Sequence, residues 1–283
     1  MSLFDYRTLC STLERLYRSY GVLPRVIART VLGRAVFALD LGTKQSRSLL
    51  LCGECGNEGT LCALALHFAE ALLCAAREDA LFCGVDARRA LRESGVTIVP
   101  CLNPDGLDLF CHGLSASGPL RRFLQPLLQP DSLWRANADG VDLRRQYPAG
   151  FSAARDFAAA QGFLLPGASN YPGSVPLSEA EPRALCGLCR RERFRHALLL
   201  REGEDALLWQ SGRDTPEKSE LCAKLLSQEA DLPLGADSDI DGTFSRWFTE
   251  TTGRPVFTAQ TGKGNVPLPE QALFSCLMLS VLL

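Results

Sequence analysis

The sequence predicts a single α/β domain, with a largely parallel or mixed central sheet and helices on both faces. Three observations predict it. Segments with the two-residue period of strands alternate along the chain with segments of helical period, which is the pattern of α/β proteins. The chain has 283 residues, 46% of them hydrophobic, which is enough for one sizeable core. It shows no internal repeat or low-complexity linker, so we expect one domain over residues 1–283.

The first hundred residues begin with an amphipathic helix and continue mainly with strands. Leu9, Leu13 and Leu16 recur at the spacing of one buried helix face. Gly33 and Arg34 divide two β-rich runs and indicate a hairpin. A later strand ends at the turn-forming sequence 103–106. The predicted elements are helices over Asp5–Tyr20 and Thr60–Ala76, and strands over Val26–Leu32, Ala35–Leu41, Ser48–Cys52 and Val96–Leu102.

The remainder of the chain has an irregular middle and a regular C-terminal part. We expect residues 119–137 to be irregular and partly helical, and the loop-rich stretch 147–178 to be a surface excursion. Glu179 and Glu181 lie in the first turn of the next helix, where they suit the helix dipole. The predicted elements are helices over Ser178–Arg193, Thr215–Glu229, Phe244–Thr251 and Pro269–Leu282, and strands over His196–Leu200, Ala206–Trp209 and Pro255–Ala259.

Charge and terminal sequences favour a cytoplasmic protein. The net charge is −2, which implies no general affinity for nucleic acid or for an anionic membrane surface. The N-terminus lacks a basic segment followed by an apolar run, so we expect no signal peptide. The apolar stretch Ala272–Leu283 is too short to span a bilayer. We therefore expect neither a nucleic-acid nor a membrane partner.

In a cytoplasmic protein, we expect the twelve cysteines to be small buried side chains rather than a disulfide framework. They include two Cys-x-x-Cys pairs, Cys52 with Cys55 and Cys186 with Cys189. A structural zinc shared by the two pairs is the alternative interpretation. The second pair falls within a predicted helix, which favours packing over metal binding.

Five groups of motifs carry a resemblance to a known family, and it is their order along the chain that makes the match specific. The chain resembles the zinc metallocarboxypeptidases of the carboxypeptidase A type. It is most similar to the bacterial branch that acts on γ-D-glutamyl-diaminopimelate links of peptidoglycan stem peptides. The motifs occupy residues 53–58, 99–106, 134–145, 170–181 and 255–264, and the resemblance runs from about Val26 to the C-terminus.

The resemblance implies a fold and a chemistry. The fold is one α/β domain around a twisted eight-stranded mixed sheet, with the site at the carboxyl ends of central strands. In the family chemistry, zinc polarises the scissile carbonyl and activates a water molecule. A glutamate takes the proton of that water, and arginines stabilise the oxyanion and hold the substrate carboxylate.

Most of the residues that this chemistry needs are altered here. By resemblance, the three metal-ligand positions fall on Cys55, Glu58 and Arg201, of which only Glu58 is retained. The general-base position falls on Gln260. A thiolate is a good zinc ligand, but the guanidinium of Arg201 has no lone pair to offer and Gln260 cannot accept a proton. We therefore expect no cofactor, with zinc bound only if the site still functions.

A buried carboxylate without a partner costs free energy of folding. We therefore hypothesise that Arg201 replaces the charge of the metal ion and pairs with Glu58.

The anion-binding half of the site is better retained. By resemblance, Arg135 stands at the oxyanion position and Arg145 at the position that grips the substrate carboxylate, with Arg144 where the family usually has Asn. Such a cluster favours a carboxylate or phosphate ligand. The alternative is that some of these arginines form structural ion pairs with Asp105, Asp139, Asp142 or Glu202, and we expect Asp142 to be structural.

The preferred function is therefore non-catalytic binding of an anionic small molecule or peptide, such as a peptidoglycan-derived stem peptide. The alternatives are an active zinc metallopeptidase with unconventional ligands and a scaffold or interaction protein. A cysteine hydrolase built on Cys55 needs a low thiol pKa and a histidine base. No histidine is an evident base: we expect His112 to be structural and His196 to lie at the surface.

Overall fold

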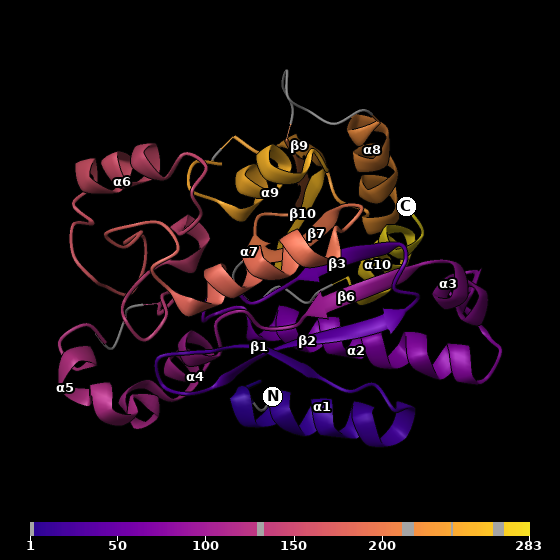
Figure 1. Cartoon of the computed structure of the whole chain (residues 1–283), viewed down its shortest axis with the longest axis horizontal. Helices are drawn as coiled ribbons and strands as arrows, with labels where there is room; N and C mark the ends of the chain where they lie inside the picture. The colour runs from indigo at the N-terminus through magenta and orange to yellow at the C-terminus, as the bar shows by residue number, and fades with distance from the viewer. Residues whose placement is uncertain (1–2, 129–132, 211–217, 239, 263–268) are drawn as a thin grey trace.

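The computed structural model describes residues 3–128, 133–210, 218–238, 240–262 and 269–283, and these contain one eight-stranded sheet (Figure 1). The strands are β1 (Arg25–Arg29), β2 (Ala35–Gly42), β3 (Arg47–Leu51), β6 (Gly95–Val99), β7 (Ala197–Gly203), β8 (Ala206–Trp209), β9 (Leu234–Ala236) and β10 (Val256–Gly262). Their order is β1-β2-β6-β3-β7-β10-β8-β9.

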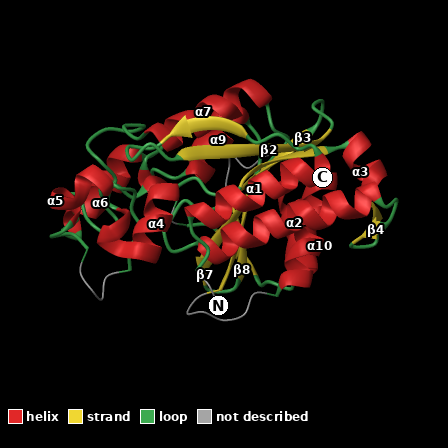
Figure 2. Ribbon diagram, turned by 90° about the horizontal axis from the view of Figure 1, so that it is seen from below, coloured by secondary structure: helices red, strands yellow, loops and turns green. Residues whose placement is uncertain are grey.

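Strand directions confirm the predicted mixed sheet. The central strands β6, β3, β7 and β10 run parallel to one another. The pairs β1–β2, β2–β6 and β8–β10 are antiparallel. In Figure 2, β2 and β7 run in clearly different directions, so the sheet is strongly twisted. A separate small hairpin joins β4 (Leu81–Phe82) and β5 (Val85–Asp86).

Helices cover both faces of the sheet, as the sequence predicts. Apolar residues of α1 (Tyr6–Tyr20), α2 (Gly59–Arg77), α8 (Ser219–Ala230) and α10 (Glu270–Leu282) pack into the core on one face. Those of α7 (Ala180–Glu192) and α9 (Phe244–Thr252) pack into the core on the other face, and Figure 2 shows α7 on the opposite side of β2 from α1 and α2. The start of the helix predicted over Thr215–Glu229 lies outside the described residues.

Two helices occur where the sequence predicted a turn and a surface excursion. The sequence Asn103–Gly106 begins α4 (Pro104–His112), because the side chain of Asn103 caps the helix by accepting a bond from the Gly106 N–H at 2.8 Å. An Asn-Pro pair opens a turn or a helix equally well, so the local sequence does not distinguish them. Helix α6 (Phe151–Ala160) lies within the predicted excursion.

Among the described helices, α2 alone is long and apolar enough to cross a membrane by length and composition. The packing explains this composition. Leu61, Ala65, Phe68 and Leu72 of α2 are buried in the core against the sheet. The burial of α2 in the core therefore accounts for its apolar composition.

Candidate functional site

The site residues predicted from the sequence meet at the carboxyl ends of three parallel strands. Cys55 and Glu58 lie in the loop between β3 and α2. Arg201 lies near the end of β7, and Gln260 is its partner in the register of β10. Parallel strands present their carboxyl ends at one edge of a sheet, which brings these distant residues together.

A glycine allows the β3–α2 loop to reach residues 135–145, which we call the arginine segment. The N–H of Gly56 donates to the carbonyl of Arg135 at 3.0 Å. A Cβ atom at Gly56 would lie 2.4 Å from the carbonyl oxygen of Gly106, so no other residue fits there without a shift of the backbone. This bond and this close approach hold the β3–α2 loop against residue 135.

Glu58 is buried and is held by backbone groups. Its Oε2 accepts from the N–H of Cys55 at 3.1 Å, and its Oε1 accepts from the N–H of Glu202 at 3.2 Å. Burial raises the pKa of this carboxyl above its usual range. Glu58 therefore ties the first motif loop to the end of β7 without using a metal ion.

The predicted ion pair between Arg201 and Glu58 is wrong. Arg201 instead donates through Nε and Nη2 to Oε2 of Glu54, at 3.1 and 2.8 Å. Both side chains are buried, and Tyr147 donates its hydroxyl to the other oxygen of Glu54 at 3.3 Å. Burial alone would lower the pKa of Arg201, but the charges of Glu54 and Asp237 and the hydrogen bonds to Glu54 together outweigh burial and raise that pKa. The guanidinium thus stays charged inside a closed network.

Cys55 is a protonated thiol in this setting. Its side chain is 1% exposed, and burial raises its pKa to about 12. Nη2 of Arg135 lies 3.7 Å from Sγ, but this neighbour does not offset the burial. A neutral thiol is a poor nucleophile. The low thiol pKa that a cysteine hydrolase requires is therefore contradicted.

Gln260 lies partly exposed beside the end of β7. A Cβ atom at Gly203 would lie 3.1 Å from Cδ of Gln260, so the amide side chain covers this glycine. An amide does not take a proton at neutral pH, and the position cannot supply general-base chemistry.

The donors at the three ligand positions do not fit a zinc ion. The third is a guanidinium, which has no lone pair to offer and already pairs with Glu54. Zinc needs deprotonated sulfur, neutral imidazole or carboxylate, commonly from three or four residues. Across the described part of the chain, no group of three His, Cys, Asp or Glu side chains is arranged to hold a metal.

The arginines divide into paired and available side chains. Arg144 binds Asp142 at 3.1 Å, and the pKa of Asp142 lies well below its usual range, chiefly because Arg144 and its hydrogen bonds outweigh burial. The structural alternative therefore applies to this pair. Arg145 donates to the carbonyl of Asp241 at 3.0 Å. Arg135 forms no ion pair with any described residue, and its Nε has no hydrogen-bond partner.

The remaining candidates have structural positions. Cys186 and Cys189 pack on the opposite face of the sheet from Cys52, so the shared zinc site does not form. His112 binds Asp5 at 3.0 Å. The prediction that His196 lies at the surface is wrong: it is 3% exposed, bonds to the hydroxyl of Ser280, and burial lowers its pKa to about 3.

Two site residues escaped the sequence analysis. Glu54 neutralises Arg201, and Asn57 bonds to Glu202, which joins the motif loop to β7 a second time. Both lie inside the motif already recognised at residues 53–58. Their polar character beside Glu58 was the available signal, but the sequence does not show which carboxylate pairs with Arg201.

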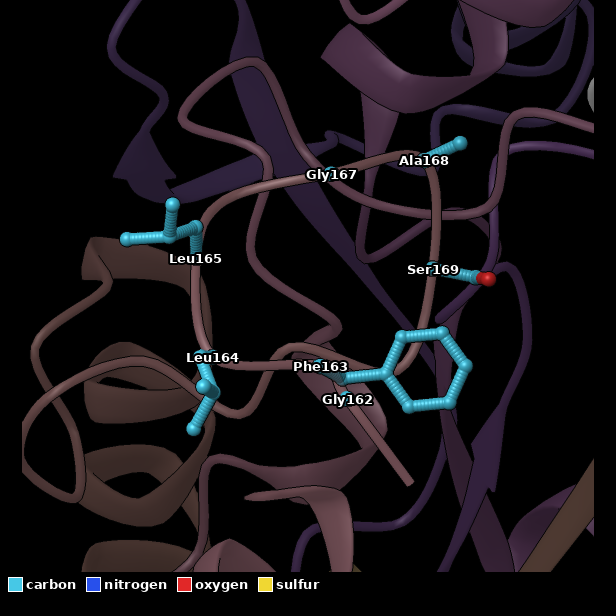
Figure 3. A pocket seen from close by; sticks show the side chains of 7 residues that line it. All are labelled: Gly162, Phe163, Leu164, Leu165, Gly167, Ala168 and Ser169. Carbon is cyan, nitrogen blue, oxygen red and sulfur yellow. The ribbon is translucent and has the colours of Figure 1, made fainter. Parts of the chain in front are cut away.

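A loop next to the arginine segment encloses an open pocket of about 400 Å³ (Figure 3). Its wall is mostly apolar, and Leu164 and Leu165 are 63% and 76% exposed. The carbonyl of Ala168 accepts from the N–H groups of Arg135 and Ala136, so the loop supports the arginine segment. The lining residues are Gly162, Phe163, Leu164, Leu165, Gly167, Ala168 and Ser169.

Comparison with known proteins gives one family and several relatives. Residues 10–252 match the family described as zinc carboxypeptidase. The chain is 26% identical over 271 residues to gamma-D-glutamyl-L-diamino acid endopeptidase 1 of Lysinibacillus sphaericus, covering 94% of this chain and 67% of that protein. It is 27% identical over 257 residues to YqgT of Bacillus subtilis strain 168, covering 87% and 66%. The chain thus spans about two thirds of the length of these curated relatives.

Solved structures share the fold at lower identity. Bovine thrombin-activatable fibrinolysis inhibitor, in complex with tick carboxypeptidase inhibitor, matches with a TM-score of 0.75 and 15% identity, covering 99% of this chain and 96% of that one. Murein-tripeptide amidase MpaA from Escherichia coli O157 matches with a TM-score of 0.54 and 23% identity, covering 92% and 89%. The eight-stranded sheet inferred from the resemblance is thereby confirmed.

Proposed function

The chain belongs to the zinc carboxypeptidase family, and we propose that it uses the family fold to bind an anionic peptide without hydrolysing it. One observation carries the proposal. At the third ligand position, Arg201 is buried and paired with Glu54, so a fixed internal ion pair stands where the chemistry needs a metal ligand. The alteration at Gln260 supports it, because a proton acceptor is missing at the general-base position.

Arg135 supports the binding part of the proposal. It forms no ion pair with any described residue, and its Nε has no hydrogen-bond partner. A guanidinium in a partly buried place favours a carboxylate, which it binds through charge-assisted hydrogen bonds. The names of two similar proteins indicate the ligand class, because they refer to a γ-D-glutamyl-diamino acid link and to a murein tripeptide.

Titration calorimetry with the tripeptide L-alanyl-γ-D-glutamyl-diaminopimelate tests the proposal. We expect saturable binding to the wild type and binding weaker by roughly 10- to 100-fold in Arg135→Ala, because one charge-assisted bond is lost. The control is Arg121→Ala, which removes an exposed arginine of α5 (Arg121–Leu124). Equal affinities for the two variants would contradict a role for Arg135.

A parallel assay separates binding from catalysis. Incubation of the tripeptide with the protein and added zinc should release no free diamino acid. Zinc-dependent hydrolysis would instead establish the active metallopeptidase, which the retained Glu58 and the thiol of Cys55 favour as the second candidate. Absence of both binding and hydrolysis would leave the scaffold protein, for which the exposed loop at Leu164 and Leu165 is the supporting feature.

A further inference from the structure

Exposed cations gather at the amino ends of the parallel strands, on the edge of the sheet opposite the candidate site. Lys44 precedes β3, Arg193 precedes β7 and Arg254 precedes β10. Because β7 lies between β3 and β10, these three chain segments enter the sheet side by side. The last turn of α7 adds Arg190 and Arg191. We call these five residues the amino-end patch.

Backbone hydrogen bonds hold these segments together. The N–H of Arg195 donates to the carbonyl of Arg47 at 2.8 Å, and the N–H of Ala197 donates to the carbonyl of Pro255 at 3.1 Å. The cations that precede the strands lie one to three residues from these bonds, and all five side chains of the patch are exposed. The patch is therefore one continuous basic edge of the molecule.

Carboxylates do not neutralise the patch. None of its five side chains forms an ion pair with a described residue. Glu192, at the end of α7, binds Arg25 at 3.4 Å and Arg47 at 3.6 Å instead. Glu250 of α9 pairs with Arg246. The net charge of −2 conceals the patch, because it averages acidic and basic surfaces over the whole chain.

The dipole of α7 explains only part of this charge. Cations in the last turn of a helix are favoured by its dipole, which accounts for Arg190 and Arg191. Arg193 follows the helix with a φ of 51°, in the left-handed region where glycine is usual. Lys44 and Arg254 precede strands, whose net dipole is small. Three of the five cations therefore have no explanation in the stability of the helix.

We propose that the amino-end patch docks the protein on an anionic lipid surface. Four of its five cations are guanidinium groups, which bind phosphate oxygens through paired hydrogen bonds. Leu282 of α10 is 40% exposed, and its carbonyl accepts from Arg195 at 3.3 Å, so an apolar side chain adjoins the patch. Cations beside an exposed apolar side chain fit the boundary between lipid head groups and acyl chains.

Nucleic acid is the alternative polyanion, and the patch does not provide the stacking surface that single strands use. Phe194 and Trp247, the aromatic residues next to it, are 1% and 3% exposed. The guanidinium carbon of Arg190 lies 5.6 Å from the ring centre of Trp247 and covers that ring. Lipid docking replaces the expectation of no membrane partner, which rested on the net charge. It leaves the candidate site, at the opposite edge of the sheet, facing away from the membrane.

Co-sedimentation with vesicles tests the docking. Wild type should bind vesicles of equal parts phosphatidylglycerol and phosphatidylcholine, should not bind phosphatidylcholine alone, and should be released by high salt. In the double variant Arg191→Ser with Arg193→Ser, binding should weaken roughly 30-fold, because each arginine near an anionic surface contributes about five-fold. The matched control, Arg121→Ser with Arg122→Ser, removes the same charge from α5, which lies well apart from the end of α7 in Figure 1. The control should bind as the wild type does.

The outcomes separate lipid docking from its alternatives. If wild type does not bind the anionic vesicles, or if the two double variants bind them equally well, the proposal is overturned. Binding to duplex DNA without binding to vesicles would assign the patch to nucleic acid and would also overturn it. Circular dichroism checks folding, and Lys44→Ser with Arg254→Ser replaces the patch variant if that variant does not fold. The affinity for the tripeptide should be unchanged in these variants, so lipid docking and the proposed function are decided separately.

Discussion

The two halves of the site differ in how their charges are neutralised. At the ends of β3 and β7, the guanidinium of Arg201 is buried and forms an ion pair with Glu54. Glu58 in the same loop accepts a hydrogen bond from the Glu202 N–H. In the arginine segment, Arg144 is paired but Arg135 is not. The half that holds the family's metal-ligand positions is satisfied internally, whereas the other half still offers a cation. The proposed absence of hydrolysis and the proposed binding of an anion therefore rest on different residues, and each can be tested alone.

Removal of the Arg201 side chain should have the largest effect, and that effect is on the stability of the protein. Arg201→Ala leaves Glu54 buried without its cation, and we expect a loss of about 3–5 kcal/mol in the free energy of unfolding. Urea denaturation measures it. The double variant Glu54→Gln with Arg201→Met removes both charges and should recover most of the loss. A single variant as stable as the wild type would contradict the ion pair.

The substitution Glu58→Gln, in the same half of the site, should reduce stability by a smaller amount. The amide keeps one of the two acceptors that hold the Cys55 and Glu202 N–H groups, so the expected cost is about 1 kcal/mol. Because the pKa of Glu58 is raised by burial, its contribution to stability is present at low pH and is lost as pH rises through the raised value. Thermal melting from pH 5 to 8 should therefore depend less on pH in the variant.

Chemical labelling of Cys55 should give the smallest response. A buried thiol with a pKa of about 12 is almost wholly protonated at pH 7.5, so iodoacetamide should not modify it in the native protein. Peptide mass mapping provides the measurement, with the urea-unfolded protein as the positive control. Rapid native labelling of Cys55 would restore the cysteine hydrolase as a candidate.

The sequence predicted the fold better than it predicted the contacts of the site. Apolar periodicity located the strands of the sheet other than β9, because burial imposes that pattern on the chain. It missed β9, an edge strand of three residues of which two are exposed. It missed α4, since Asn103 and Pro104 have the same local chemistry at a helix start as in a turn. It missed α6 because only Phe151, Ala154 and Ala158 are buried there, which leaves a faint stripe among alanines.

In the site, the sequence identified the altered positions but not their partners. Glu54 and Glu58 lie four residues apart in one loop, and either could meet Arg201 from a strand 147 residues away. The choice depends on the direction in which each side chain leaves the loop, which sequence spacing does not record. The same limit hid the hydrogen bond from Asn137 to Glu179, because a helix cap and a distant turn meet only in the folded chain.

The stoichiometry of bound zinc tests the central claim most directly. The protein is incubated with excess zinc under reducing conditions, dialysed, and compared with Glu58→Ala by elemental analysis. We predict no zinc that depends on Glu58, because Arg201 at the third ligand position has no lone pair to offer and pairs with Glu54 instead. One tightly bound zinc in the wild type, absent from the variant, would contradict the account and establish a metal site.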